Sequence, residues 1–170
     1  MDRHIISVLV KNSAGVLSRV AGLFTRRGFN IESLTVGSTE NPEFSRMTIT
    51  MVGNEGNLEQ IKNQLNKLYD VVKVVELKSG NSVIRELVLI KVNATDAERG
   101  AINEIANIFR CKIVDISSDT LTIELTGDES KISALIKLME KYGIREIVRT
   151  GIVALERGEN DIQSYEETWV

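Results

Sequence analysis

The sequence predicts an α+β protein made of two tandem ferredoxin-like βαββαβ domains, each an antiparallel sheet with both helices packed on one face. Two observations lead to this prediction. The strand and helix signals of residues 4–77 recur in the same order at residues 85–157, and such repetition indicates a duplicated folding unit. Residues 78–82 are polar and contain glycine and serine, which is typical of a linker.

The repeat sets the expected domain boundaries. We expect a first domain at residues 1–78, a linker at residues 79–84, a second domain at residues 85–158 and a mobile tail at residues 159–170. From Gly158 onward the chain carries four acidic side chains and little periodicity, which favours a frayed terminus. Tyr165 and Trp169 leave a second interpretation open, in which the tail docks on a partner.

The first repeat begins with a strand at residues 4–10 and a helix at residues 16–27. The side chains at helical spacing are Val16, Val20, Leu23, Phe24 and Arg27. Two arginines in the last turn suit the negative end of the helix dipole, and Gly28 after them can supply a left-handed cap. Both ends of this helix are therefore well defined by the sequence.

The rest of the first repeat predicts two strands, a helix and a closing strand. Residues 31–38 form a strand, a turn follows at Pro42, and residues 46–52 alternate methionine or isoleucine with threonine. That alternation predicts a half-buried strand. Residues 58–68 carry leucine and isoleucine at helical spacing, and residues 71–77 are rich in β-branched side chains.

The second repeat predicts the same six elements. We expect strands at residues 87–92, 113–117, 121–126 and 144–155, and helices at residues 101–109 and 132–142. The side chains expected to face the core from these helices are Ile102, Ile105, Phe109, Ile132, Leu135, Leu138, Met139 and Tyr142. The last strand is longer than its counterpart in the first repeat.

Units of about 75 residues bury limited apolar surface on their own. In the first strand, either Ile5 with Leu9 or Val8 with Val10 must face away from the helices, and that set needs cover. We therefore expect dimerisation through a sheet face or a sheet edge.

Composition and charge exclude several classes of function. The net charge of −3 offers no basic field to a phosphate backbone, so nucleic acid is not an expected partner. No apolar run approaches the ~18 residues of a membrane helix, and the start lacks a secretory signal, so we expect no membrane span and a cytoplasmic location. One cysteine, Cys111, and one histidine, His4, are too few for an internal disulfide or a zinc site.

No catalytic constellation is recognisable in the sequence. Glycine-rich phosphate loops are absent, the carboxylates are dispersed, and we expect Cys111 and His4 to lie apart. RNA-recognition modules share the βαββαβ order but stack bases on aromatic side chains that these strands lack. We therefore expect no catalytic residue, metal or cofactor in this chain.

The connection between the first strand and the first helix is the candidate binding feature. The N–H groups of a starting helix attract an anion, and Gly15 would let a ligand approach the backbone. Asn12 could hold an ammonium or a carboxylate, while Val16, Leu17 and Ile31 could surround a short aliphatic side chain. Local pattern leaves helix capping open as the alternative for Asn12. Asn30 also has a structural alternative, because asparagine often occupies a turn only for its tolerance of unusual backbone angles.

A longer pattern surrounds this loop. Residues 12–36 carry N-x-x-G-V-L-x-R-V-x-x-L-F-x-x-R-G-x-N-I-x-S-L-T-V, and SRMTI follows at residues 45–49. The second repeat carries IFR at residues 108–110, IVD at residues 113–115 and LERG at residues 155–158. Residues 3–158 thus resemble the small subunits of acetolactate synthase, with long spacings that agree in both repeats.

The resemblance implies an N-terminal ACT domain and a second ferredoxin-like domain in a non-catalytic regulatory subunit. In that family a separate large subunit holds thiamine diphosphate, Mg²⁺ and FAD, and the small subunit raises its activity and makes it sensitive to valine. The effector lies between two ACT domains of a homodimer. The resemblance assigns it Asn12, Gly15, Val16 and Leu17 of one chain and Asn30 and Ile31 of the other.

Two other functions remain as alternatives. A free-standing amino-acid sensor could regulate another partner, although no DNA-binding unit accompanies the repeats. A small acyl-phosphate hydrolase has a compatible topology and would turn over substrate without a partner. The effector preference, the stoichiometry and the surface that meets a large subunit are not encoded in any recognisable pattern.

Overall fold

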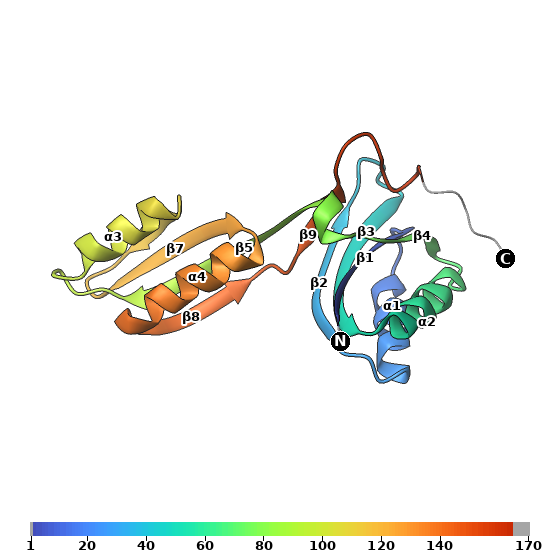
Figure 1. Ribbon diagram of the computed structural model, residues 1–170, viewed down its shortest axis with the longest axis horizontal. Helices are drawn as coiled ribbons and strands as arrows, with labels where there is room; N and C mark the ends of the chain where they lie inside the picture. Colours follow the sequence, from blue (N-terminus) through green and yellow to red (C-terminus); the bar gives the residue numbers. More distant parts are fainter. Residues whose placement is uncertain (1, 165–170) are drawn as a thin grey trace. The chain divides into compact units, whose positions relative to one another are not determined.

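The computed structural model describes residues 2–164, which form two compact units (Figure 1). The first unit comprises the chain up to Val83 together with the segment from Ile152 onward, and the second comprises residues 84–151. By this division residues 152–158, which we expected in the second domain, belong with the first unit. Tyr165 and Trp169 lie outside the described residues.

The first unit has the predicted element order. Its elements are β1 (Asp2–Lys11), α1 (Val16–Arg26), β2 (Ile31–Ser38), β3 (Phe44–Gly53), α2 (Glu55–Asn66) and β4 (Val71–Glu76). The strands form an antiparallel sheet in the order β2-β3-β1-β4, and α1 and α2 lie on one side of it (Figure 1). A short 3₁₀ turn, η1 (Ser79–Asn81), follows where a linker was expected.

The second unit repeats this arrangement. Its elements are β5 (Ser82–Asn93), α3 (Arg99–Ile108), β6 (Lys112–Ile116), β7 (Thr120–Gly127), α4 (Glu129–Met139), the 3₁₀ turn η2 (Glu140–Tyr142) and β8 (Ile144–Arg149). The strand order is β6-β7-β5-β8, and β9 (Val153–Glu156) pairs with β5. The predicted fold class, two ferredoxin-like units with antiparallel sheets, is confirmed.

Each unit has its own core between sheet and helices. In the first, Ile6, Val8 and Val10 of β1 pack with the apolar stripes of α1 and α2. In the second, Val88, Ile90 and Val92 of β5 pack with the stripes of α3 and α4. The helices are 10 to 12 residues long, and no helix among residues 2–164 is long and apolar enough to cross a membrane.

The end of α1 shows how the local sequence determines where a helix stops. Gly28 has φ +71, and its N–H donates to the Thr25 carbonyl while the Phe29 N–H donates to the Phe24 carbonyl. This pair of bonds is a Schellman motif, so the left-handed cap predicted at Gly28 is confirmed. Arg27 is an exposed cap residue and takes no part in the buried stripe.

The prediction of a half-buried β3 is wrong. Met47, Ile49 and Met51 face the helices and are buried, but Thr48 and Thr50 on the other face are also only 4% and 0% exposed. The chain itself covers this outer face with the segment that begins at Ile152. The Thr35 hydroxyl donates to the Ile152 carbonyl over 2.8 Å, and Ile152 and Ala154 are buried.

The face of β1 that points away from the helices is also buried within the single chain. Ile5 and Leu9 face away from the helices, yet they are only 8% and 6% exposed within a single chain. Cover of this face therefore does not require a second chain. The edges of the sheet, β2 and β4, remain available for pairing, and Val36 on β2 is 46% exposed.

Two further expectations for the second repeat are corrected. The single strand expected at residues 144–155 is broken into β8 and β9, because Gly151 has φ +87 and a left-handed residue cannot continue a strand. Leu138 is 41% exposed, so it does not face the core. Leu135 and Met139, one turn apart on α4, are buried as predicted.

Candidate ligand-binding site

The loop before α1 leaves the start of the helix without a side-chain cap. Gly15 is the N-cap residue, and no side chain among residues 2–164 caps the first turn by a hydrogen bond. Asn12 is engaged elsewhere: its N–H donates to the Glu43 carbonyl over 2.7 Å and its side-chain Nδ2 to the Pro42 carbonyl over 3.0 Å. The capping interpretation of Asn12 is therefore not what the structure shows. The positive end of the helix remains open to an anion.

The backbone conformation at Gly15 favours glycine. Its φ is +84, which side chains other than glycine rarely adopt. An added Cβ would lie 3.1 Å from Nη1 of Arg19, so the Arg19 guanidinium lies beside the helix start. The loop thus combines an exposed backbone with a nearby cation.

Asp70 orients this cation. The Arg19 Nε donates to Asp70 Oδ2 over 2.9 Å, and Nη2 lies 2.6 Å from the same oxygen. Neither contact uses Nη1, which is the guanidinium nitrogen nearest to Gly15. Sequence reasoning missed Arg19. The signal that could have found it is its spacing, because residue 19 lies one helical turn after residue 15 on the same face.

The other predicted site residues differ in what they expose. Val16 is 3% exposed and belongs to the core, so only its main chain can face a ligand. Leu17 is 45% exposed and can offer its side chain. Asn30 is exposed, and Ile31 is half-buried against the core.

The structure does not bring the two groups of predicted residues together within one chain. Gly15 precedes α1 and Asn30 follows it, and the helix between them has 11 residues. At 1.5 Å per residue such a helix is about 16 Å long. A pocket for a small molecule that uses both ends of α1 therefore needs two chains.

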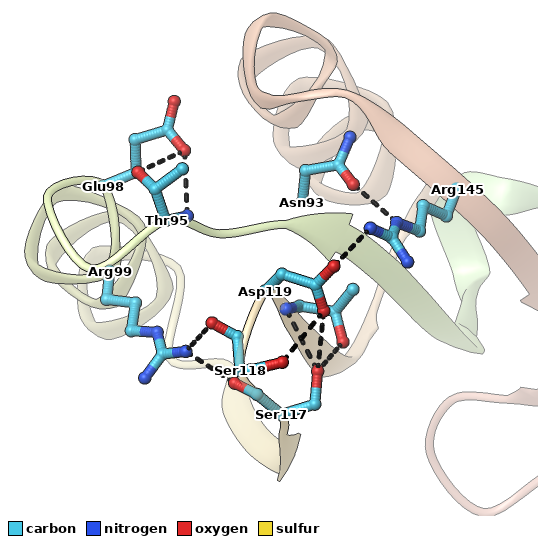
Figure 2. Close-up of polar contacts among 9 residues, drawn as sticks. Asn93, Thr95, Glu98, Arg99, Ser117, Ser118, Asp119 and Arg145 are labelled. Carbon is cyan, nitrogen blue, oxygen red and sulfur yellow. Dashed lines mark hydrogen bonds and ion pairs between the residues drawn. The ribbon is translucent and has the colours of Figure 1, made fainter.

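The corresponding helix start of the second unit has charged side chains with hydrogen-bond partners of their own (Figure 2). Oε2 of Glu98 accepts hydrogen bonds from the Thr95 N–H over 3.0 Å and from its hydroxyl over 2.9 Å. These bonds hold the pKa of the Glu98 carboxyl below its usual value. Arg99 donates to the carbonyls of Ser117 and Ser118. As at α1, no side chain in the described part of the chain caps α3, but the carboxylate of its N-cap residue, Glu98, adds a negative charge beside this helix start.

Other groups capable of chemistry are dispersed. His4 is buried, with Nδ1 3.3 Å from Glu76 Oε1 and Nε2 3.3 Å from the Gly53 carbonyl oxygen. Cys111 belongs to the second unit, and burial raises the pKa of its thiol. Among residues 2–164, no three histidine, cysteine or carboxylate side chains are grouped to hold a metal ion.

Family models match both units of the chain. Residues 6–73 match the model described as the AHAS small subunit-like ACT domain. Residues 85–158 match the model described as the small subunit of acetolactate synthase. The two matches follow the two repeats and leave the segment after residue 158 outside.

Individual relatives agree over almost the whole chain. The probable acetolactate synthase small subunit of Archaeoglobus fulgidus is 58% identical over 92% of this chain and 98% of its own. The acetolactate synthase small subunit of Mycolicibacterium smegmatis is 54% identical over 94% of each chain. A crystal structure of the Thermotoga maritima acetolactate synthase small subunit is 44% identical and superposes with a TM-score of 0.87, covering 94% of this chain and 100% of the other. The resemblance seen in the sequence is confirmed.

Proposed function

Because the chain belongs to the family of acetolactate synthase small subunits, we propose that it regulates branched-chain amino-acid synthesis in the cytoplasm through feedback by valine or a related amino acid. The regulated enzyme is a separate large subunit that carries thiamine diphosphate, Mg²⁺ and FAD. This chain raises the activity of that subunit and transmits the inhibition. It contributes no catalytic group.

The open helix start at Gly15 is the observation that carries the effector proposal. The carboxylate of an amino acid would accept hydrogen bonds from the first-turn N–H groups of α1, with Nη1 of Arg19 beside it. Leu17 would contact the aliphatic side chain. The Asn12 side chain already donates to Pro42, so its remaining acceptor, Oδ1, is suited to the ammonium.

The second half of the pocket comes from a partner copy. Asn30 and Ile31 follow the far end of α1, so they complement the Gly15 loop only when two ACT domains meet. The β2 edge that begins at Ile31 offers unpaired backbone groups for such a contact. The proposed homodimer forms through the first unit, and each pocket takes residues from both chains.

Inhibition then follows from a difference in affinity between two states of the complex. A ligand shifts an equilibrium only if it binds one state more tightly. An effector that bridges two ACT domains favours the relative orientation in which both halves of its pocket are complete. The inhibited state of the large subunit is the one coupled to that orientation, and by reciprocity the inhibited complex binds valine more tightly.

Calorimetry on the complete chain tests the pocket. Valine, leucine and isoleucine are titrated separately, with alanine as the control because it lacks the branched side chain. Saturable binding of a branched-chain amino acid supports the proposal. Failure of all three to bind at millimolar concentration contradicts it.

A second experiment tests the partner and separates the alternatives. The purified chain is added to a thiamine-dependent large subunit, and acetolactate formation is measured with and without valine. Activation together with valine inhibition supports the proposal. Binding of an amino acid without activation favours a free-standing sensor, and turnover of an acyl phosphate by the isolated chain favours the hydrolase.

A further inference from the structure

A cavity of about 460 Å³ lies in the first unit, away from the Gly15 loop. Leu9, Phe44, Arg46, Val75 and Leu77 line it from the outer face of the sheet. Residues 38–40, at the β2–β3 connection, line one side, and residues 155, 156, 158 and 160–163 of the C-terminal segment line another. Pockets that hold small molecules have volumes of about 300–1,000 Å³, so this cavity is large enough for one.

Arg46 supplies the cavity with unused hydrogen-bond donors. Its Nε donates to the hydroxyl of the fully buried Ser7 over 2.7 Å, which fixes the plane of the guanidinium. The two terminal nitrogens make no hydrogen bond or ion pair with any residue in the described part of the chain. Burial lowers the pKa of Arg46 and Glu40 partly offsets this, but an arginine stays protonated. A half-buried cation with free donors favours a carboxylate, which can accept two of them.

The other charges of the cavity restrict the class of ligand. Glu40, Glu156 and Asp161 line it together with Arg46. Hydrogen bonds from Gln163 and Ser164 lower the pKa of Asp161, and Lys73, whose Nζ donates to the Gln163 carbonyl, helps to lower it. Asn81 donates to Glu156 over 2.9 Å. Asp161 accepts from the N–H groups of Gln163 and Ser164. These bonds orient the two acidic groups without removing their charge. A ligand with several negative charges, such as a nucleotide, is therefore repelled.

The apolar lining determines the rest of the ligand. Leu9, Phe44, Val75 and Leu77 on the sheet face Leu155 and Ile162 of the covering segment. Such a surface binds an aliphatic body and excludes water. At about 30 Å³ per water, the cavity has the volume of roughly fifteen water molecules. A chain of several methylene groups fits this space.

We propose that this cavity binds an amphipathic monocarboxylate, with the carboxylate held by the terminal nitrogens of Arg46 and the aliphatic body lying between the sheet and residues 155–162. The site shares no residue with the proposed effector pocket, and it does not depend on the feedback function. A bound ligand would contact both the sheet and residues 155–162, and would therefore stabilise the packing of this segment on the sheet.

Octanoate is the probe, and binding to the complete chain is measured by calorimetry. 1-Octanol tests the need for the carboxylate, and octyl phosphate tests the exclusion of a dianion. Octanoate should bind more tightly than either compound. Absence of octanoate binding, equal binding of the alcohol or tighter binding of the phosphate overturns the proposal.

Variants locate the bound probe. Arg46→Met keeps the apolar bulk and removes the donors, so octanoate affinity should fall roughly tenfold to a hundredfold, as for a lost charged hydrogen bond. Arg46→Lys keeps the positive charge but lacks the two terminal nitrogens that can bind a carboxylate at two points, so it should give an intermediate affinity. Leu155→Trp fills the cavity from a residue that is 59% exposed, so the fold is preserved while binding is lost.

Gly15→Asp is the matched control for the other pocket. It should leave octanoate affinity unchanged, because Gly15 does not line the cavity. Circular dichroism and thermal melting confirm that each variant is folded before titration. Wild-type octanoate affinity in folded Arg46→Met and Leu155→Trp, or loss of binding in Gly15→Asp alone, overturns the assignment.

Discussion

Replacing Gly15 by aspartate should abolish effector binding and leave the first unit folded. The residue is exposed, and an added Cβ would meet only the end of the flexible Arg19 side chain. The main cost is the left-handed backbone at φ +84, about 1–2 kcal/mol for an ordinary residue and less for aspartate or asparagine. Gly15→Asn carries the same backbone cost and nearly the same volume, so it is the control.

The two variants differ by one charge, and that charge sets the size of the effect. The proposed ligand carboxylate lies at the first turn of α1, and a separation of about 4 Å from the new carboxylate is a direct contact between like charges. At this distance two like charges repel by about 4 kcal/mol for an effective dielectric constant of about 20. The new carboxylate would also compete for Nη1 of Arg19. Allowing for screening at an exposed loop, valine should bind at least about a hundredfold more weakly to Gly15→Asp than to Gly15→Asn.

Calorimetry with valine at low and high salt measures this difference, which should shrink as salt screens the charges. Activity with the large subunit should stay at its wild-type level without valine and should resist valine only in Gly15→Asp. A ratio of affinities below about tenfold between the two variants would refute the argument that an anion sits at the helix start.

Three other predictions test the site and the cores. Arg19→Met combined with Asp70→Asn, which avoids an unpaired carboxylate, should weaken valine binding about tenfold in calorimetry, and wild-type affinity would exclude Arg19 from the pocket. Leu65→Ala should lower the free energy of unfolding in urea by about 2–5 kcal/mol because Leu65 is 0% exposed. Leu17→Ala, at a side chain 45% exposed, should change it by less than about 0.5 kcal/mol, and equal effects would contradict the burial argument. Because the pKa of Cys111 is raised and the thiolate is the reactive form, the rate of its alkylation should still rise with pH above about 9, whereas a plateau below that pH would contradict the raised pKa.

The fold was predictable because its signals are local. Val16, Val20, Leu23 and Phe24 occupy one helical stripe and are all buried. Gly28 ends that helix with the bonds that its position predicts. Each such signal depends on residues within a few positions of one another. Because the pattern of strands and helices is repeated, the same topology is predicted for both units.

The expectations that failed depend on distant contacts. The alternation in β3 predicts that Thr48 and Thr50 are exposed to solvent, but both are buried in a unit that also includes the segment from Ile152, about a hundred residues further along the chain. The hydrogen bond from Thr35 to Ile152 spans 117 positions. No periodicity within β3 records what packs above it. The break at Gly151 was missed for a related reason, because the β-branched residues on either side suggest one continuous strand.

The loop of the candidate site can be proposed from the sequence, whereas the ionic contacts around it cannot. Sequence pattern identified Gly15 and Asn12, because a helix start is defined by neighbours in the chain. It could not decide between capping and ligand binding for Asn12, since that depends on Pro42 and Glu43 thirty residues away. The Arg19–Asp70 pair bridges 51 positions and was not considered.

The two repeats provide an internal comparison that bears on the number of effector sites. In both repeats the first strand leads into a helix. Topology alone would therefore predict two equivalent anion-binding positions per chain, one at each helix N-terminus. At the start of α3 the N-cap residue is Glu98, and its carboxylate is held nearby by two hydrogen bonds from Thr95. A ligand carboxylate at that position would meet a fixed negative charge, whereas at Gly15 it meets an uncapped helix start and Arg19. We therefore expect one effector position per chain, at Gly15, because the two repeats share their fold and differ in a few residues of this loop.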